Sequence, residues 1–283
     1  MRQGRVPICN SSSHLGVTST QLKLIALICM TLDHTAKVIG QYGLMILVPK
    51  ASLAATANVC AVLEAVGRLA FPLFAFLLSQ SAAKTRSMPK FILRLTLFAV
   101  LSEPVFWYAN YGYNQAFAVF WKHVSGLNLN NVFWTFVLAA GVIYTHQRLQ
   151  RRNFRCWQLW FPLCFLAGVL TAEWIGCDYG GMGVMLVVGL YLCKTAPQKM
   201  AVVIAWSLLL YAFGQAFNGR GFNWWQVSVH SWLNCLVSML SCVLIWWYNE
   251  QRGRGLKWLF YFYYPGHFMV LAVVRQLLYS KAA

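Results

Sequence analysis

The chain has 283 residues, of which 59% are hydrophobic and only 10% are charged. Soluble domains carry about 25% charged residues, so this composition excludes an ordinary soluble domain and indicates a polytopic helical membrane protein. The formal net charge of +17 does not predict nucleic-acid binding, because the basic residues fall mostly in short segments between apolar runs. The nine scattered cysteines form no C-x-x-C pair, and we expect no metal site.

Residues 1–20 are polar and rich in serine, and we expect them to form a flexible cytoplasmic tail. Residues 21–283 are predicted to form one all-α transmembrane domain. Apolar runs of bilayer-spanning length predict about nine transmembrane helices, and their boundaries are approximate. The runs lie near residues 22–48, 57–82, 89–109, 130–147, 157–176, 180–194, 199–217, 228–248 and 258–279.

The loops predict the orientation, because Lys and Arg accumulate on the cytoplasmic side of a membrane. With the N-terminus inside, the inner segments hold Lys84, Arg86, Lys90, Arg148, Arg151, Arg152, Arg155, Lys194, Lys199, Arg252, Arg254 and Lys257. The outer segments hold only Lys50, Lys122, Arg220 and Lys281. The alternation therefore predicts a cytoplasmic N-terminus and a C-terminus on the opposite side.

Several ionisable residues lie inside the predicted spans. Charged groups at the centre of a span cost about 2.5–3.5 kcal/mol each on insertion scales, so such residues indicate function by default. They are Asp33, His34 and Lys37 in the first span, Arg68 in the second, Glu103 in the third and His267 in the ninth.

Helical geometry relates the residues of the first span to one another. Asp33 and Lys37 are one turn apart and can pair, whereas His34 points about 100° away from Asp33, so we do not expect Asp33 to orient His34 directly. Arg68 lies at a similar depth to Asp33 and is predicted to pair with it between helices. That pair is either structural or part of a site.

His34 also shares a helix face with Lys23, because eleven residues make nearly whole turns and separate the two by about 16 Å along the axis. This arrangement suits a ligand with an anionic head at the surface and a reactive arm inside. In the ninth span, Pro265 and Gly266 precede His267, and we expect them to interrupt the helix and open a cavity beside the imidazole.

Four stretches resemble the TraX family, the pilin acetylases of F-type conjugation systems. They are "LKLIALICMTLDHTAKVIG", "GRLAFPLFAFLLSQSAAKTRSMPKFILRLTLFAVLSEPVF", "CDYGGMGVMLVVGLYL" and "KWLFYFYYPGHFMVLAV", in chain order. The family resembles the broader class of transmembrane acyltransferases, whose first span carries a basic residue, ten intervening residues and a histidine. Lys23 and His34 match that spacing.

The resemblance implies transfer of acetyl from acetyl-CoA to the N-terminal amine of pilin in the bacterial inner membrane, with membrane lipid as the surroundings. By this resemblance His34 is the principal catalytic candidate, supported by Asp33, Arg68 and His267. The coenzyme A candidates are the basic residues Lys23, Lys84, Arg86, Arg148, Arg151, Arg152 and Arg155. The candidates for contact with the acceptor are Glu103, Asp178 and Tyr264.

Two other functions remain open at this stage. Mid-membrane His and Asp also serve proton-coupled transporters, although no internal repeat or matching pair of broken helices is found. A non-catalytic membrane subunit of a conjugation apparatus is the second alternative. For an acetyltransferase, direct transfer is favoured over an acyl-enzyme on Cys29, because the sequence contains no Ser-His-Asp motif.

Overall fold

The structure is a computed structural model that describes residues 16–48, 50–111, 118, 120–122, 124–126, 128–152, 156–214, 227–255 and 257–282. These residues are predominantly helical, and an isolated β-bridge joins Val17 to Tyr248. The predicted all-α fold is therefore confirmed. The elements are α1 (Ser19–Leu47), α2 (Leu53–Gly67), α3 (Ala70–Lys84), α4 (Met88–Tyr111), α6 (Val132–Arg151), α7 (Trp157–Trp174), α8 (Gly180–Leu192), α9 (Ala196–Ser207), η1 (Leu208–Phe213), α11 (Val229–Trp246) and α12 (Lys257–Ala282).

Each predicted apolar run falls on one helix or on two adjoining helices. Within the described ranges, four helical segments are long and apolar enough to cross a membrane. They are Leu53–Lys84, Met88–Tyr111, Ala196–Phe213 and Val229–Trp246. These segments mark the chain as a helical membrane protein, whereas the number of nine crossings stays a prediction.

The second predicted span is divided into α2 and α3 at Arg68 and Leu69. Pro72 explains the position of this break, because a proline lacks the N–H that would bond the carbonyl four residues earlier, which is that of Arg68. Gly67, the last residue of α2, allows α2 to approach α1 closely, since a Cβ atom at this position would overlap the side chain of Asp33. This close approach places the end of α2 beside Asp33 of α1.

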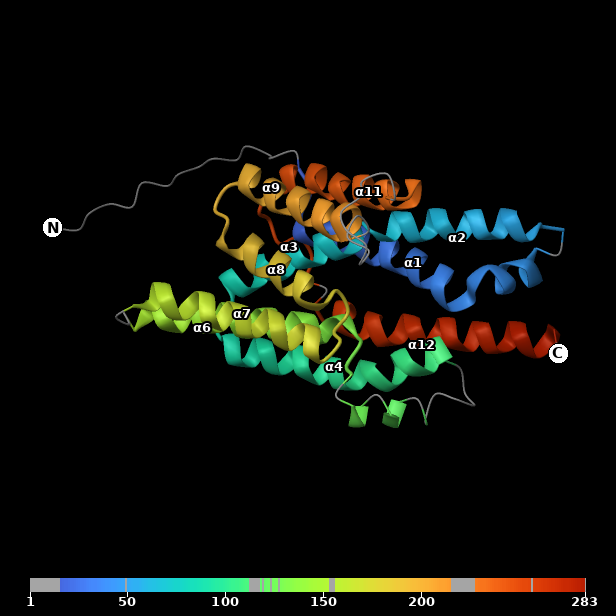
Figure 1. Cartoon of the computed structure of the whole chain (residues 1–283), viewed down its shortest axis with the longest axis horizontal. Coiled ribbons are helices and arrows are strands. Elements are labelled where there is room, and N and C mark those ends of the chain that lie inside the picture. The colour runs from blue at the N-terminus through green and yellow to red at the C-terminus, as the bar shows by residue number, and fades with distance from the viewer. Residues whose placement is uncertain are drawn as a thin grey trace.

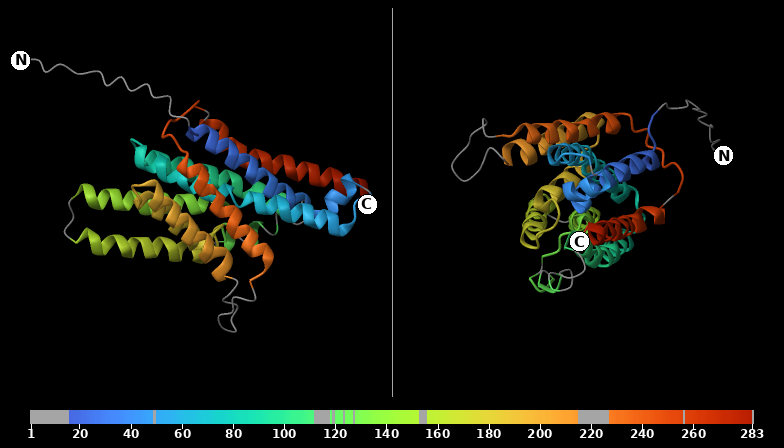
Figure 2. Two further views of the ribbon diagram at one scale, coloured as in Figure 1. Left: turned by 90° about the horizontal axis from the view of Figure 1, so that it is seen from above. Right: turned by 90° about the vertical axis from the view of Figure 1, so that its right-hand side faces the viewer.

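Helices α1 and α12 lie side by side and run in the same direction (Figures 1 and 2). At their beginnings, the hydroxyl groups of Ser19 and Thr20 each donate a hydrogen bond of 2.9 Å to the carbonyl of Arg252. Near their ends, the Tyr279 hydroxyl donates to the carbonyl of Ile39 at 3.3 Å. This parallel pairing brings the middle of the first span against the middle of the ninth.

The expected interruption of the last helix is wrong. Helix α12 continues through Pro265 and Gly266 from residue 257 to residue 282. One proline removes a single hydrogen-bond donor from the helix, and the packed neighbours α1 and α4 hold the remaining turns in place. His267 is therefore presented by a regular helix face rather than by a broken one.

Helix α8 lies at the centre of the bundle, packed against α3, α6, α7 and α9. Its side chains from Val184 to Leu190 are largely buried. By contrast, α7 buries only Ala172 and exposes large apolar side chains along most of its length. An exposed apolar face of this size suits contact with lipid.

Candidate functional site

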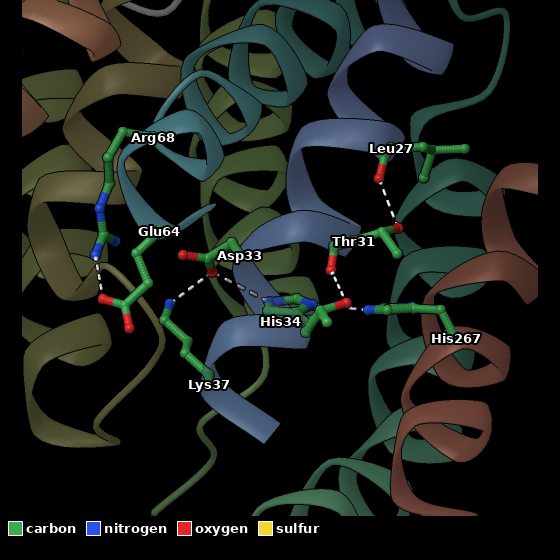
Figure 3. Close-up of polar contacts among 9 residues, drawn as sticks. Leu27, Thr31, Asp33, His34, Lys37, Glu64, Arg68 and His267 are labelled. Carbon is green, nitrogen blue, oxygen red and sulfur yellow. Dashed lines mark hydrogen bonds and ion pairs between the residues drawn. The ribbon is translucent and has the colours of Figure 1, made fainter. Parts of the chain in front are cut away.

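His34 of α1 and His267 of α12 form a direct contact in the middle of the bundle (Figure 3). The Nδ1 atom of His34 lies 2.7 Å from the Nε2 atom of His267, and the two rings stack with their centroids 5.0 Å apart. Phe268 packs against the His34 ring at 4.4 Å between centroids. Two histidines that the sequence separates by 233 positions therefore make one polar unit between α1 and α12.

The hydrogen bonds of this unit assign the tautomers of both rings. The Nδ1 atom of His267 lies 2.9 Å from the carbonyl of Tyr263, which can only accept, so this nitrogen carries the proton. The Nε2 atom of neutral His267 is then an acceptor, and the Nδ1 atom of His34 must donate to it. The remaining nitrogen of His34, Nε2, keeps a free lone pair and is the basic atom of the pair.

Asp33 lies on the other side of His34 and carries the negative charge of the site. Its Oδ2 atom is 2.6 Å from the Lys37 ammonium, so the predicted pair one turn apart on α1 is confirmed. The same oxygen is 3.8 Å from the Nε2 atom of His34, although the backbone directions of these two residues differ by about 100°. No hydrogen bond joins the two side chains at this distance, which agrees with the expectation that Asp33 does not orient His34 directly. An imidazolium at His34 would nevertheless face this carboxylate.

The predicted ion pair between Asp33 and Arg68 is absent from the described residues. Instead, the Arg68 guanidinium lies 3.8 Å from Glu64, one turn earlier on α2 (Figure 3). The Cζ atom of Arg68 is 5.9 Å from the centre of the Tyr211 ring. Equal depth in the membrane did not imply contact, because the bend after Gly67 directs Arg68 toward η1.

Two hydroxyl groups join α1 to α12 next to the histidines. The Thr31 hydroxyl lies 2.7 Å from the hydroxyl of Tyr263, and Thr31 also donates to the carbonyl of Leu27. Tyr264 places its ring 5.6 Å from that of His267 and 6.3 Å from that of His34, measured between centroids. The histidine pair is thus enclosed by aromatic rings and held from both helices.

A cavity of about 500 Å³, which we call the basic cavity, approaches this pair from the end of the bundle where α1 begins. Among the described residues, its mouth is lined by the carboxylate of Glu250 and by six cations, which are Lys23, Lys84, Arg86, Arg94, Arg252 and Arg254. Deeper inside it is lined by apolar and aromatic side chains that include Leu27, Met30, Phe133, Phe136 and Tyr264.

The face of α1 that was predicted to carry both Lys23 and His34 lies along the basic cavity. Lys23, Leu27 and Met30 all line it, and His34 follows one turn after Met30 on the same stripe. The Lys23 ammonium lies 5.0 Å above the ring of Phe260. A ligand that fills the cavity would extend from a cationic mouth toward Tyr264 and the histidine pair.

The predicted coenzyme A residues are distributed unevenly. Lys23, Lys84 and Arg86 line the basic cavity, whereas Arg148, Arg151 and Arg152 lie at the end of α6 and do not. Arg155 lies outside the described residues. Sequence reasoning missed Arg94, Arg252 and Arg254, although the last two stood in an inner loop whose charges signalled orientation alone.

The predicted acceptor residues also occupy different surroundings. Tyr264 lies between the basic cavity and the histidines, as described above. Glu103 is buried, and its carboxylate accepts hydrogen bonds from the indoles of Trp107 and Trp134, from the Asn130 amide and from the Asn131 side chain. These four donors satisfy the hydrogen-bonding capacity of the buried carboxylate, which thereby links α4 to the beginning of α6. Asp178 lies in the turn between α7 and α8, with an exposed side chain.

Comparisons with known proteins agree with the sequence resemblance. A curated relative, "Probable fimbrial assembly protein FimC, serogroup H1" of Dichelobacter nodosus, is 28% identical over 277 residues, which cover 94% of this chain and 99% of the relative. No solved structure matches the chain significantly. A family model described as "TraX protein" matches residues 18–275, a range that contains α1 through most of α12 and both histidines. The chain belongs to the TraX family.

Proposed function

We propose that the protein is a membrane-embedded acetyltransferase that moves an acetyl group from acetyl-CoA to the N-terminal amine of a pilin subunit held in the same membrane. The observation that carries the proposal is the position of Tyr264, which lines a cavity with a cationic mouth and an apolar interior and lies 6.3 Å from the His34 ring between centroids. The Nε2 atom of His34 has a free lone pair. The TraX family resemblance and the fimbrial name of the relative support a pilin as acceptor.

The basic cavity suits acetyl-CoA as the donor substrate. The six cations at its mouth complement the negative phosphates at the nucleotide end of coenzyme A. Arg94, Arg252 and Arg254 carry guanidinium groups, each of which can donate two hydrogen bonds to one phosphate group. The narrow phosphopantetheine arm can follow the stripe of Leu27 and Met30 inward. The thioester would then lie near Tyr264, within reach of the histidine pair.

The reaction needs a base for the attacking amine. The neutral amine nitrogen attacks the thioester carbonyl carbon, its proton passes to the Nε2 atom of His34, and the carbon–sulfur bond breaks as the amide forms. The coenzyme A thiolate then takes the proton from the His34 imidazolium and leaves as a thiol. During this sequence Asp33 stabilises the imidazolium, and His267 keeps its Nδ1 proton in place.

The loop charges support a cytoplasmic location for the mouth of the basic cavity, on the side from which acetyl-CoA would enter. Arg252 and Arg254, Lys84 and Arg86, and the beginning of α1 all meet at its mouth. Three segments that the charge pattern assigns to the inside therefore lie together. This common location supports a cytoplasmic N-terminus.

The test uses the purified protein in lipid nanodiscs with radiolabelled acetyl-CoA and a synthetic peptide that begins with a pilin-like apolar segment. Acetylation of the peptide α-amine, located by mass spectrometry, supports the proposal. The same peptide with a blocked N-terminus is the matched control and should stay unlabelled. If the wild-type protein leaves the free peptide unlabelled while it drives proton flux across vesicles, the transporter alternative replaces the proposal.

A further inference from the structure

We propose that a second cavity, at the opposite end of the bundle from the basic mouth, admits the acceptor as an extended peptide end that carries a protonated primary amine, and that Asp178 recognises this amine. The reaction that follows rests on the proposed function.

This second cavity, which we call the Asp178 cavity, has a volume of about 370 Å³. It is lined by Phe106, Asn110 and Tyr111 of α4, by Asn130 and by the turn of residues 176–179. The basic cavity touches α4 only near its beginning, at Phe91, Arg94 and Leu95. The two cavities therefore lie at different ends of α4, which runs lengthwise in the bundle (Figure 1).

The turn that carries Asp178 is held in place by its neighbours. The Thr135 hydroxyl of α6 donates to the main-chain carbonyl of Asp178. The next residue, Tyr179, has a left-handed backbone with a φ of 61°, and its ring stacks on Phe71 with the centroids 3.7 Å apart. The Asp178 carboxylate is thus presented from a fixed backbone, and it is the only charged group among the described residues that line the cavity.

Asp178 lies within the electrostatic range of the charged residues around His34. Its carboxylate interacts electrostatically with Lys37, Asp33 and Arg68, which all belong to the polar centre. Lys37 stands in the middle of α1, yet 41% of its side chain is exposed. An ammonium exposed to hydrocarbon at this depth is very costly, so the space beside Lys37 must hold water or polar groups. The proposed route of the amine runs from Asp178 toward Asp33, the carboxylate that lies 3.8 Å from the Nε2 atom of His34.

The charge balance of the route selects a cation. Three carboxylates, those of Asp33, Glu64 and Asp178, stand against two cations, Lys37 and Arg68. The mouth of the basic cavity has the opposite balance, with six cations and one carboxylate. The two ends thus separate the substrates by charge, because phosphates are attracted to one end and an ammonium group to the other. The ammonium gives its extra proton to water beside Asp178 before the neutral amine reaches His34.

The experiment measures peptide binding independently of turnover. A peptide with a free N-terminal amine and a benzophenone at its fifth position is photocrosslinked to the protein in nanodiscs without acetyl-CoA. We expect the crosslinks to form at residues 106–111 and 176–179. An excess of peptide without benzophenone should suppress the crosslinks when its N-terminal amine is free, and should suppress them only weakly when this amine is acetylated. Asp178→Asn should reduce crosslinking about tenfold, as expected for loss of one charge-assisted contact. Glu173→Gln is the matched control, because Glu173 lies at the same end of the bundle but does not line the cavity, and we expect this substitution to leave crosslinking unchanged.

Kinetics provide the second measurement. Asp178→Asn should raise the KM for the peptide about tenfold and leave the KM for acetyl-CoA unchanged. Crosslinks within the basic cavity, equal competition by the N-acetylated peptide, or unchanged crosslinking in Asp178→Asn would each overturn the inference. Specific crosslinking without any acetyl transfer would support the Asp178 cavity as an amine site while contradicting the proposed reaction, so the two failures are distinguishable.

Discussion

The Nδ1 atom of His34 lies 2.7 Å from the Nε2 atom of His267, so the proton on one ring decides which nitrogen of the other is free. The Tyr263 carbonyl completes this relation, because it requires a proton on the Nδ1 atom of His267. A backbone group of α12 therefore sets the tautomer of a side chain on α1. The basic atom of the site is defined by three residues, of which only one would exchange protons with a substrate.

Replacement of His34 tests the basic atom directly. Glutamine has a similar size and can still hydrogen-bond to His267, but it has no basicity at neutral pH. We expect His34→Gln to fold and to bind acetyl-CoA normally, and to acetylate the peptide at least about a hundredfold more slowly. Single-turnover kinetics give the rate, and a fluorescent coenzyme A analogue gives the affinity. Near-normal turnover of His34→Gln, combined with inactive His267→Gln, would move the base to α12.

His267 is a positioning residue in this scheme, and two substitutions separate its hydrogen bond from its volume. His267→Phe keeps a ring against His34 but removes the acceptor, so His34 loses its fixed tautomer and we expect the turnover to fall about tenfold to a hundredfold. His267→Gln offers an amide oxygen as an acceptor and should recover much of the rate. The readout is the peptide acetylation rate across a pH range, since only the tautomer role predicts rescue by Gln.

Substitutions at the mouth of the basic cavity should weaken the binding of acetyl-CoA without slowing the reaction of the bound substrate. Lys23→Ala and Arg94→Ala each remove one cation that lines the cavity, so we expect the KM for acetyl-CoA to rise about threefold to tenfold with kcat unchanged. Arg148→Ala is the matched control, because Arg148 lies outside the cavity at the end of α6. Equal effects of all three substitutions would indicate a general surface charge effect instead of a phosphate site.

Local periodicity was enough to predict part of this site. The 3.6-residue repeat places Lys23 and His34 on one face of α1, and the four-residue spacing pairs Asp33 with Lys37. Both statements depend only on one helix, whose geometry the sequence determines. The apolar runs likewise located the helices, because their length and composition are set by the bilayer.

Relations between helices could not be obtained in this way. The depth of a residue is readable from its position in a span, but the direction of its side chain around the bundle is not, and the predicted pair of Asp33 with Arg68 was wrong for this reason. The contact of His34 with His267 depends on the parallel packing of the first and last helices. Arg252 and Arg254 were missed because orientation already explained their charge.

Gly67 permits the close approach of α2 to α1, and a methyl group there would overlap Asp33. We expect Gly67→Ala to lower the free energy of unfolding by about 1–3 kcal/mol, because the overlap forces the two helices apart. Gly141→Ala is the control, since nothing lies within 4 Å of a Cβ atom at that position. Thermal unfolding in detergent compares the two variants, and equal stability would contradict the tight contact.

Removal of Asp33 and removal of Lys37 should lower the stability of the protein by different amounts. The Asp33 side chain is only 10% exposed, whereas that of Lys37 is 41% exposed. Lys37→Ala strands a buried carboxylate and should destabilise the protein by about 3 kcal/mol, whereas Asp33→Ala leaves a solvated ammonium at a cost of about 1 kcal/mol. Denaturant unfolding measures both, and the double variant Asp33→Asn with Lys37→Gln, which strands no charge, should lie near the wild type. If Asp33→Ala were the more destabilised single variant, Asp33 would also support Arg68.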